Sequence, residues 1–215
     1  MPIHENIYKA IREKIVLGKL MPGERITEAE LAQKFSCSRS PVREALARLE
    51  KEGYLEILPR RGAVATKISP REVSDYYALL SVLEGKAVEW AAPRLKPEDL
   101  DRLEAINQSM KNISADSGSA VEDWVELNWA FHQMFRVGCG NLKMDWLVQE
   151  IRARITRSLY TSLMVPVFDD YIVDHALIIQ RLREGDAAQA RQAMEMHILR
   201  AQQVLDRFFS LNQHA

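Results

Sequence analysis

Residues 36–65, which decide the fold of the first part of the chain, read SCSRSPVREALARLEKEGYLEILPRRGAVA. Ser38 and Ser40 can cap the start of a helix, and Pro41 suits its first turn, where a missing backbone N–H costs nothing. Apolar residues at spacings of three and four then predict one buried stripe, made of Val42, Ala45, Leu46 and Leu49. The predicted helix ends at Gly53.

The residues that follow this helix predict a pair of short strands joined by a basic turn. Residues 54–58 have strand composition, and residues 63–67 can return as the second strand. Between them, Pro59-Arg60-Arg61-Gly62 is typical of a turn and carries two cations. We therefore expect a two-stranded β-wing.

Two further helices are predicted upstream. An isoleucine every fourth residue predicts a one-faced helix that ends near Gly18, with a stripe of Ile3, Ile7, Ile11 and Ile15. Thr27, with Glu30 three residues later, is a capping box at the start of the second helix. Three helices with a short turn before the last, followed by a wing, form a winged helix-turn-helix, whose last helix enters the major groove of DNA.

These residues resemble the N-terminal domain of the GntR family of bacterial winged-helix regulators. The resemblance covers about the first third of the chain and rests on PGERITEAELAQKFSCSRSPVREALARLEKEGYLEILPRRGAVA, with SRSPVREAL as its specific core. It implies a transcriptional regulator that binds double-stranded operator DNA.

The expected DNA contacts lie at the start of the third helix and at the tip of the wing. Arg43 projects away from the apolar stripe and can offer its guanidinium group to guanine O6 and N7. The helix N-terminus favours a phosphate, and the wing can reach the DNA backbone, with Gly62 allowing close approach. The alternative is that these arginines form an ordinary solvated face. The predicted set is Ser38, Arg39, Ser40, Pro41, Arg43, Arg48, Arg60, Arg61 and Gly62.

The length of 215 residues suggests two domains, residues 1–68 and residues 69–215. The chain has no run of 18 apolar residues and no signal-peptide pattern, so we expect a soluble, cytoplasmic protein that does not enter a membrane. Cys37 and Cys139 lack the spacing of a metal or redox motif and are expected to be small buried or part-buried thiols.

Charge is unevenly distributed along the chain. Residues 1–67 carry 13 Lys and Arg against 9 Asp and Glu, a net charge of +4. The remainder carries 16 against 21, a net charge of −5. Positive charge is therefore concentrated in the part whose motif indicates a polyanionic partner.

After Pro70 the periodicity stays helical, which predicts an all-α bundle of six to seven helices and a mostly α protein. The predicted helices cover residues 70–92, 97–113, 119–137, 141–163, 168–184 and 186–210. The tryptophans have helical spacing and aliphatic neighbours, so we expect core or dimer-interface positions rather than a ligand cage for Trp90, Trp124, Trp129 and Trp146.

Three histidines lie on the inward faces of three different predicted helices. They are His132, His175 and His197, and Asn128 lies one turn before the first of them. Each imidazole taken singly can be a hydrogen-bonded core residue. One divalent metal ion such as Zn, Ni, Co or Mn would satisfy all three together, and Asn128 can add a carbonyl oxygen.

The second domain resembles the FCD-type effector domain found behind GntR winged helices. The resemblance rests on SVLEGKAVEWAA, LNWAFHQMF and DHALIIQRLREGDAAQARQAMEMHI. It implies a metal held by an Asp-x3-His pair and two further histidines. The metal ligands carried over are His132, His175 and His197, with Asn128 where Asp is common, which lowers the charge of the site.

The resemblance also implies a small organic acid as effector. An Arg that often precedes the Glu of the LEG segment by four residues is replaced here by Leu80, so the carboxylate needs another cation. Arg152, Arg154 and Arg157 are candidates. Arg154 and Ser158 border the inward arc of their helix and are the predicted effector-binding residues, although these arginines can equally be surface cations.

We therefore expect a ligand-responsive repressor that binds palindromic DNA as a homodimer and is not an enzyme. Two alternatives differ in class. A metal site with an open position could be hydrolytic, but no Glu or Asp is an evident inward-facing base near the histidines. The helical domain could also be a metal-free protein-interaction module.

Overall fold

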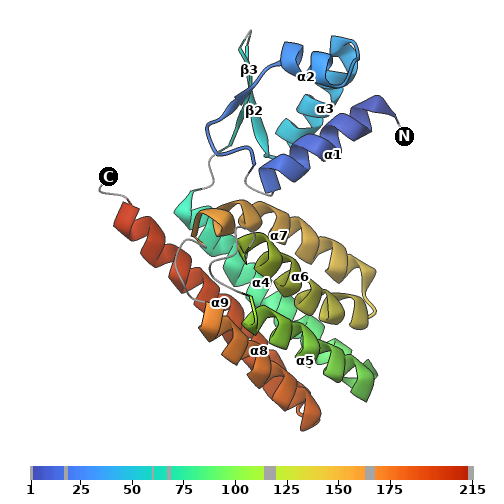
Figure 1. The fold of residues 1–215 in the computed structure, drawn as a ribbon, viewed down its shortest axis with the longest axis vertical. Coiled ribbons are helices and arrows are strands. Elements are labelled where there is room, and N and C mark those ends of the chain that lie inside the picture. Colours follow the sequence, from blue (N-terminus) through green and yellow to red (C-terminus); the bar gives the residue numbers. More distant parts are fainter. Residues whose placement is uncertain are drawn as a thin grey trace. The chain divides into compact units, whose positions relative to one another are not determined.

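The computed structural model describes residues 2–16, 19–59, 61–66, 69–113, 120–162 and 168–212. Contacts divide the chain into two compact units, with a break between Ser69 and Pro70 (Figure 1). The first unit contains a small sheet and the second is helical, so the mostly α fold is confirmed.

The first unit has the predicted helix-turn-helix and wing. Its elements are α1 (Ile3–Val16), β1 (Arg25–Ile26), α2 (Glu28–Lys34), α3 (Arg39–Lys51), β2 (Leu55–Leu58) and β3 (Gly62–Ala65). The strands are antiparallel in the order β1-β3-β2, with Leu55 opposite Ala65 and Arg25 opposite Val64. Strand β1 was not predicted, because two residues are too few to show an alternating pattern.

Local signals place these helices as expected, with two differences. Thr27 Oγ1 accepts from the backbone N–H of Glu30 at 3.2 Å, and the Glu30 carboxylate accepts from the Thr27 N–H at 2.9 Å, which confirms the capping box. Ser38 occupies the N-cap of α3 but makes no side-chain capping bond. Ile3 is 37% exposed, whereas the other three isoleucines of its stripe and all four apolar residues of the α3 stripe are buried.

The second unit is an all-helical bundle. Its helices are α4 (Pro70–Ala91), α5 (Pro97–Lys111), α6 (Ala120–Gly138), α7 (Leu142–Ser162), α8 (Phe168–Arg183) and α9 (Ala187–Asn212), with a short 3-10 turn at Ala92–Arg94. All limits lie within two residues of those predicted. None of the described helices is long and apolar enough to cross a membrane.

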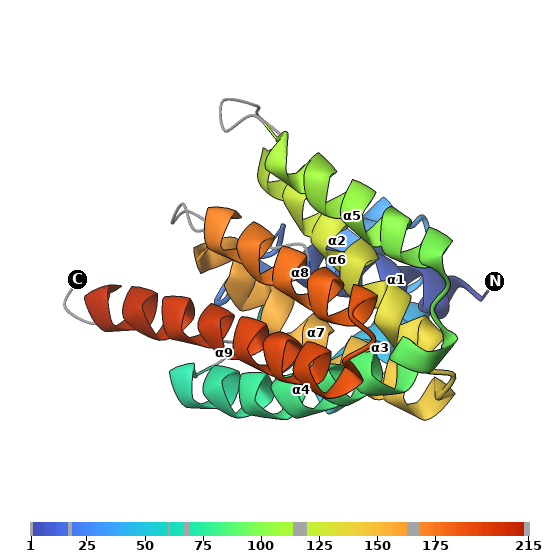
Figure 2. The same cartoon turned by 90° about the horizontal axis from the view of Figure 1, so that it is seen from below.

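Helix α4 runs along α9, which also packs against α8, while α5 contacts α6 and α8 (Figures 1 and 2). The close approach of α4 and α9 depends on Gly85. A Cβ atom added there would lie 2.6 Å from Cγ of Glu195 on α9. This packing gathers one face of each of α4, α6, α8 and α9 around a common core.

Candidate metal centre and nucleic-acid interface

The three predicted histidines meet inside the second unit. His132 comes from α6, His175 from α8 and His197 from α9, and each is at most 4% exposed. One ring nitrogen of each lies within 4.8 Å of the others, and Nε2 of His175 is 3.3 Å from Nε2 of His197. The ring of Phe131 stacks on His175 with centroids 3.9 Å apart, which fixes the plane of that imidazole.

Several polar atoms of this cluster are left unsatisfied. His132 Nε2, His175 Nδ1 and Asn128 Oδ1 are buried, and no described residue hydrogen-bonds to them. Each such atom costs about 1–3 kcal/mol. Two nitrogens bound to one tetrahedral zinc ion at about 2.1 Å are about 3.4 Å apart, close to the observed His175–His197 spacing. The three imidazoles therefore fit a divalent metal by chemistry and by spacing, and the amide oxygen fits it by chemistry.

Sequence reasoning missed two buried acidic residues beside the histidines. One is Asp174 of α8, whose Oδ2 lies 3.5 Å from Nδ1 of His197. The other is Glu84 of α4. It is 1% exposed, and its two carboxylate oxygens contact Nδ1 of His132 and Nε of Arg152. The expectation that no inward acid lies near the histidines is therefore wrong. The missed signal is a polar stripe at i, i+4 and i+7 on one face of α4, made of Tyr77, Ser81 and Glu84.

Burial keeps the imidazoles of His132 and His175 neutral, and the neighbouring charges keep the Glu84 carboxylate ionised. Burial, reinforced by the Arg152 charge, lowers the pKa of His132 to about 3. Burial and the two other imidazoles hold the pKa of His175 well below its usual value. For Glu84, burial acts to raise the pKa, but Arg152 and His132 outweigh it and hold the pKa below its usual range. Neutral imidazole is the form that binds metal.

Of the candidate cations on α7, Arg152 is the one that the structure shows buried beside Glu84, and effector binding by Arg154 stays a prediction. Arg154 is half-buried and follows Arg152 by two residues, so its side chain leaves α7 about 200° away around the helix. The side chain of Ser158 lies outside the described residues. Leu80 is a buried apolar residue, in keeping with its place in the core.

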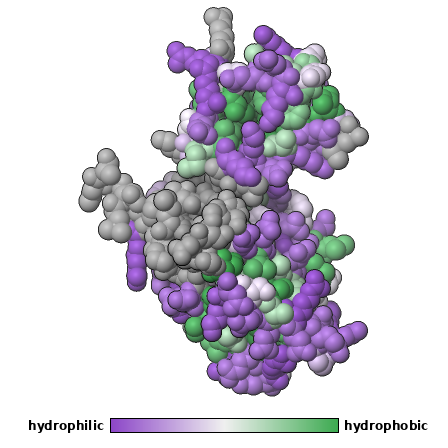
Figure 3. Space-filling view, viewed as in Figure 1, coloured by the Kyte–Doolittle hydropathy of each residue, from purple (hydrophilic) through white to green (hydrophobic). Residues whose placement is uncertain are grey.

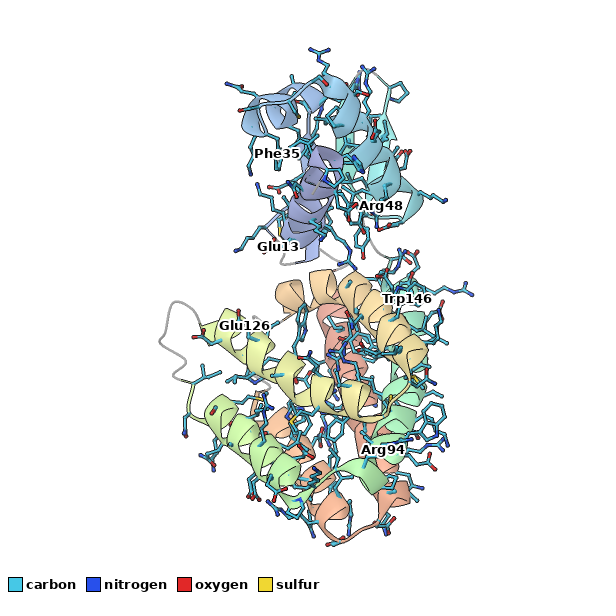
Figure 4. The ribbon with its side chains drawn as sticks, turned by 90° about the vertical axis from the view of Figure 1, so that its right-hand side faces the viewer. Glu13, Phe35, Arg48, Arg94, Glu126 and Trp146 are labelled. Carbon is cyan, nitrogen blue, oxygen red and sulfur yellow. The ribbon has the colours of Figure 1, made fainter. Side chains whose placement is uncertain are left out.

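The tryptophans divide between core and surface. Trp124 is buried, with its ring 5.5 Å from that of Tyr171. Trp129 is half-buried, whereas Trp90 and Trp146 are 36% and 61% exposed. Trp146 projects from the outer side of α7 (Figure 4). A ligand cage of four tryptophans is therefore excluded.

In the first unit, the N-terminal part of α3 presents an exposed polar face. Ser38, Arg39, Ser40 and Arg43 are exposed, and Pro41 is half-buried. Nε of Arg43 pairs with Glu28 at 2.9 Å, yet the side chain remains 66% exposed and can exchange this partner for another. Hydrophilic side chains gather over the visible face of this unit in Figure 3.

Arg48 does not share that face. Its guanidinium stacks over the ring of Tyr8, 3.8 Å from the centroid, and pairs with Glu5 at 2.9 Å and Glu52 at 3.1 Å. Two of these partners belong to α1, so Arg48 fastens α1 to α3 (Figure 4). Its side chain is 47% exposed, and its predicted DNA contact stays a prediction.

At the wing, the structure gives Gly62 a different role from the one expected. Its φ is +86°, and an added Cβ atom would lie 2.3 Å from the carbonyl oxygen of Ile26. The close approach that requires glycine is therefore to β1. Arg61 is exposed in the turn between β2 and β3, and Arg60 lies outside the described residues.

Two family models match the chain. The model described as "Bacterial regulatory proteins, gntR family" matches residues 3–64, and the FCD domain model matches residues 75–200. The first match covers most of the first unit and the second covers most of the second unit.

Individual proteins that are similar to this chain over most of its length are consistent with these family matches. The chain is 28% identical over 206 residues to the HTH-type transcriptional repressor RspR of Escherichia coli (strain K12), covering 92% of this chain and 86% of that protein. It is 26% identical over 208 residues to the HTH-type transcriptional repressor GlaR of the same strain, covering 89% and 90%. The solved structure of E. coli McbR/YncC is similar in fold, with a TM-score of 0.81 at 19% identity over 97% of this chain and 99% of that one.

Proposed function

This chain belongs to the gntR family of bacterial regulatory proteins and carries an FCD domain, and on that premise we propose that it is a repressor whose DNA binding is controlled by a small organic acid bound at a metal ion. The proteins of this family to which it is similar are transcriptional regulators and not enzymes, so the hydrolase alternative is set aside. The first unit would bind operator DNA through α3 and the wing. The second would bind the ligand and form the dimer.

The observation that carries this proposal is the convergence of three buried imidazoles, one ring nitrogen of each lying within 4.8 Å of the others. His132, His175 and His197 would hold the metal, and Asn128 Oδ1 is one turn from His132 on α6. Glu84 holds the other nitrogen of His132 and thereby orients the ring, as outer carboxylates do in metal sites. A divalent ion held there would supply positive charge that attracts a carboxylate oxygen.

The helices that supply these side chains make the site suited to a switch. The ligating residues come from α6, α8 and α9, Glu84 comes from α4, and Arg152 comes from α7. Ligand binding would therefore alter the packing of several helices at once. Helix α4 begins at Pro70, directly after the break between the units, so a shift of α4 is passed along the chain. Repression is relieved only if the ligand prefers the conformer that binds DNA poorly.

We further propose that the outer face of α4 is the dimer interface. Three large apolar residues stand exposed along this face, namely Leu79, Val82 and Trp90. Exposed apolar patches of this kind mark interaction surfaces. A two-fold dimer would present two winged helices to half-sites about 34 Å apart, one turn of DNA.

The test compares metal content and DNA binding in the same samples. Full-length protein and the His175→Ala variant are purified without metal-binding tags, their metal is measured by elemental analysis, and their affinity for a palindrome selected from random duplexes is measured by fluorescence anisotropy. His4→Ala, which changes an imidazole in the first unit, is the matched control. We expect about one metal ion per chain in the parent and control, far less in His175→Ala, and selective palindrome binding in all three. Equal metal content in His175→Ala and the parent contradicts the site.

A further inference from the structure

Two acidic side chains lie at the start of α2, and they have different partners. The carboxylate of Glu30 accepts from the backbone N–H of Thr27 at 2.9 Å and so belongs to the capping box. The carboxylate of Glu28, the first residue of α2, instead accepts from Nε of Arg43 on α3 at 2.9 Å. Glu28 therefore links the two helices of the helix-turn-helix and is not needed for the helix cap.

This contact orders a side chain that would otherwise have many rotamers, which it loses at a cost in conformational entropy. The acid next to Arg43 on its own helix, Glu44, is engaged elsewhere. Its carboxylate lies 3.5 Å from Oγ of Ser40 and 3.6 Å from Nδ1 of His4. The side chain of Glu28 is 29% exposed against 66% for Arg43, so the carboxylate is the more firmly placed partner. The direction of the Arg43 guanidinium is therefore set from α2.

The pairing leaves the arginine able to read a base. A guanidinium group has five N–H donors in a rigid plane, and Nε supplies one of them. With Nε held by Glu28, the terminal nitrogens of Arg43 can still meet guanine O6 and N7 together. The pair therefore does not have to open when Arg43 reads guanine, and a side chain that is already ordered gives up less freedom on binding.

The charge of Glu28 has the opposite effect on binding to DNA in general. A carboxylate beside the reading helix repels phosphates whatever the base sequence, so it weakens non-specific binding. A repulsion shared by all sequences changes no base preference, whereas an oriented guanidinium favours guanine, which offers it two acceptors. The two effects can therefore be separated by comparing duplexes that differ at one base pair with random duplex.

We infer, building on the DNA-binding role proposed for α3, that Glu28 is a positioning residue for base recognition. It holds the Arg43 guanidinium in the orientation that donates to guanine, and so sets the preference for guanine at one position of each half-site. Its own charge also weakens binding to DNA that lacks this guanine, because the phosphates repel it and no base contact offsets the repulsion.

The test uses the full-length protein and the palindrome selected from random duplexes. Each base pair is replaced in turn in both half-sites, and affinities are measured by competition in fluorescence anisotropy at one fixed salt concentration. Arg43→Ala first identifies the position at which Arg43 reads guanine. At that position we expect the parent to prefer guanine by about 5- to 150-fold, the value of one bidentate contact.

Further variants separate positioning from charge. Glu28→Ala should lower this preference by about threefold or more, as expected for contacting residues, while random duplex binds as tightly as to the parent or more tightly. Glu28→Gln keeps an acceptor for the Arg43 Nε–H and should restore most of the preference. Glu13→Ala removes a charge from an exposed position on α1 and should retain all of it. In the Arg43→Ala background, Glu28→Ala should change no base preference.

The outcomes distinguish this inference from the function on which it rests. If Arg43→Ala relaxes no position, the proposed base reading by α3 is wrong and this inference falls with it. If Arg43→Ala relaxes one position but Glu28→Ala leaves the preference there unchanged, this inference alone is wrong. A loss of affinity in Glu28→Ala that is equal for all duplexes, or that Glu13→Ala reproduces, also overturns it, because a structural or general charge effect then accounts for the result.

Discussion

Replacing Glu84 by Gln tests the network that holds His132 in place. The substitution keeps the size of the side chain but removes the carboxylate that pairs with buried Arg152, and Glu84 is 1% exposed. Breaking a buried ion pair costs about 3–5 kcal/mol, because a charge is left without its counter-ion in the interior. We expect the free energy of unfolding of the metal-free protein to fall by about 3 kcal/mol, which is the lower end of that range because Gln retains a hydrogen-bond acceptor.

The assay is urea unfolding followed by circular dichroism, with Glu184→Gln as the matched control. Glu184 pairs with Arg181 at 2.8 Å on the surface of α8 and its flanking turn, where the two side chains are 42% and 31% exposed. Such surface pairs contribute about 0–1 kcal/mol, so the control should lose little. A loss in Glu84→Gln no larger than that of the control would refute the reasoning. Zinc affinity should also fall about 10–100-fold, because the carboxylate orients His132.

Four further predictions follow from the contacts and charges described. The pKa of His132 is about 3 in the folded state and about 6.5 in the unfolded state, so its contribution to the stability of the metal-free protein is complete above pH 6.5 and is lost as the pH falls towards 3. About 2 kcal/mol of this contribution should be lost by pH 5. Urea unfolding at pH 7 and pH 5 measures the loss, and equal stability at the two pH values contradicts it. Arg43→Ala should weaken palindrome binding by about 1–3 kcal/mol and relax specificity at one base pair, with unchanged affinity as the contrary result. Arg48→Ala should instead lower the melting temperature of the first unit without changing base preference, since Arg48 stacks on Tyr8; altered specificity would restore its predicted role in DNA contact. Val82→Glu should convert a dimer to a monomer in analytical ultracentrifugation, and a retained dimer would place the interface elsewhere.

The limits of the helices were largely predictable because the residues that begin and end each helix can be recognised in the local sequence. Pro70 and Pro97 begin α4 and α5, and Gly140 and Gly185, both with positive φ, lie in the turns that end α6 and α8. Regular apolar spacing between these breaks determines which face is buried, which is why three histidines on separate helices could be placed inward before their contacts were known.

Roles that depend on contacts between residues far apart in the chain were harder to predict from the sequence. The acid of the LEG segment, Glu84, gains its role from Arg152, a residue 68 positions away that has no local signal. Arg48 follows Arg43 by five residues on one helix, and only the position of Tyr8 shows that its guanidinium stacks against α1. Gly62 is typical of a turn in sequence, and the need for glycine becomes clear only once β1 lies beside β3.

The central claim, a metal bound by three buried imidazoles, is tested most directly by X-ray absorption at the zinc edge of the zinc-loaded protein. We expect about three imidazole nitrogens per zinc at about 2.0–2.1 Å, with the remaining scattering from oxygen. The multiple scattering typical of imidazole should decrease in His197→Gln. Zinc surrounded by oxygen alone, or by sulfur from cysteine, would contradict the account.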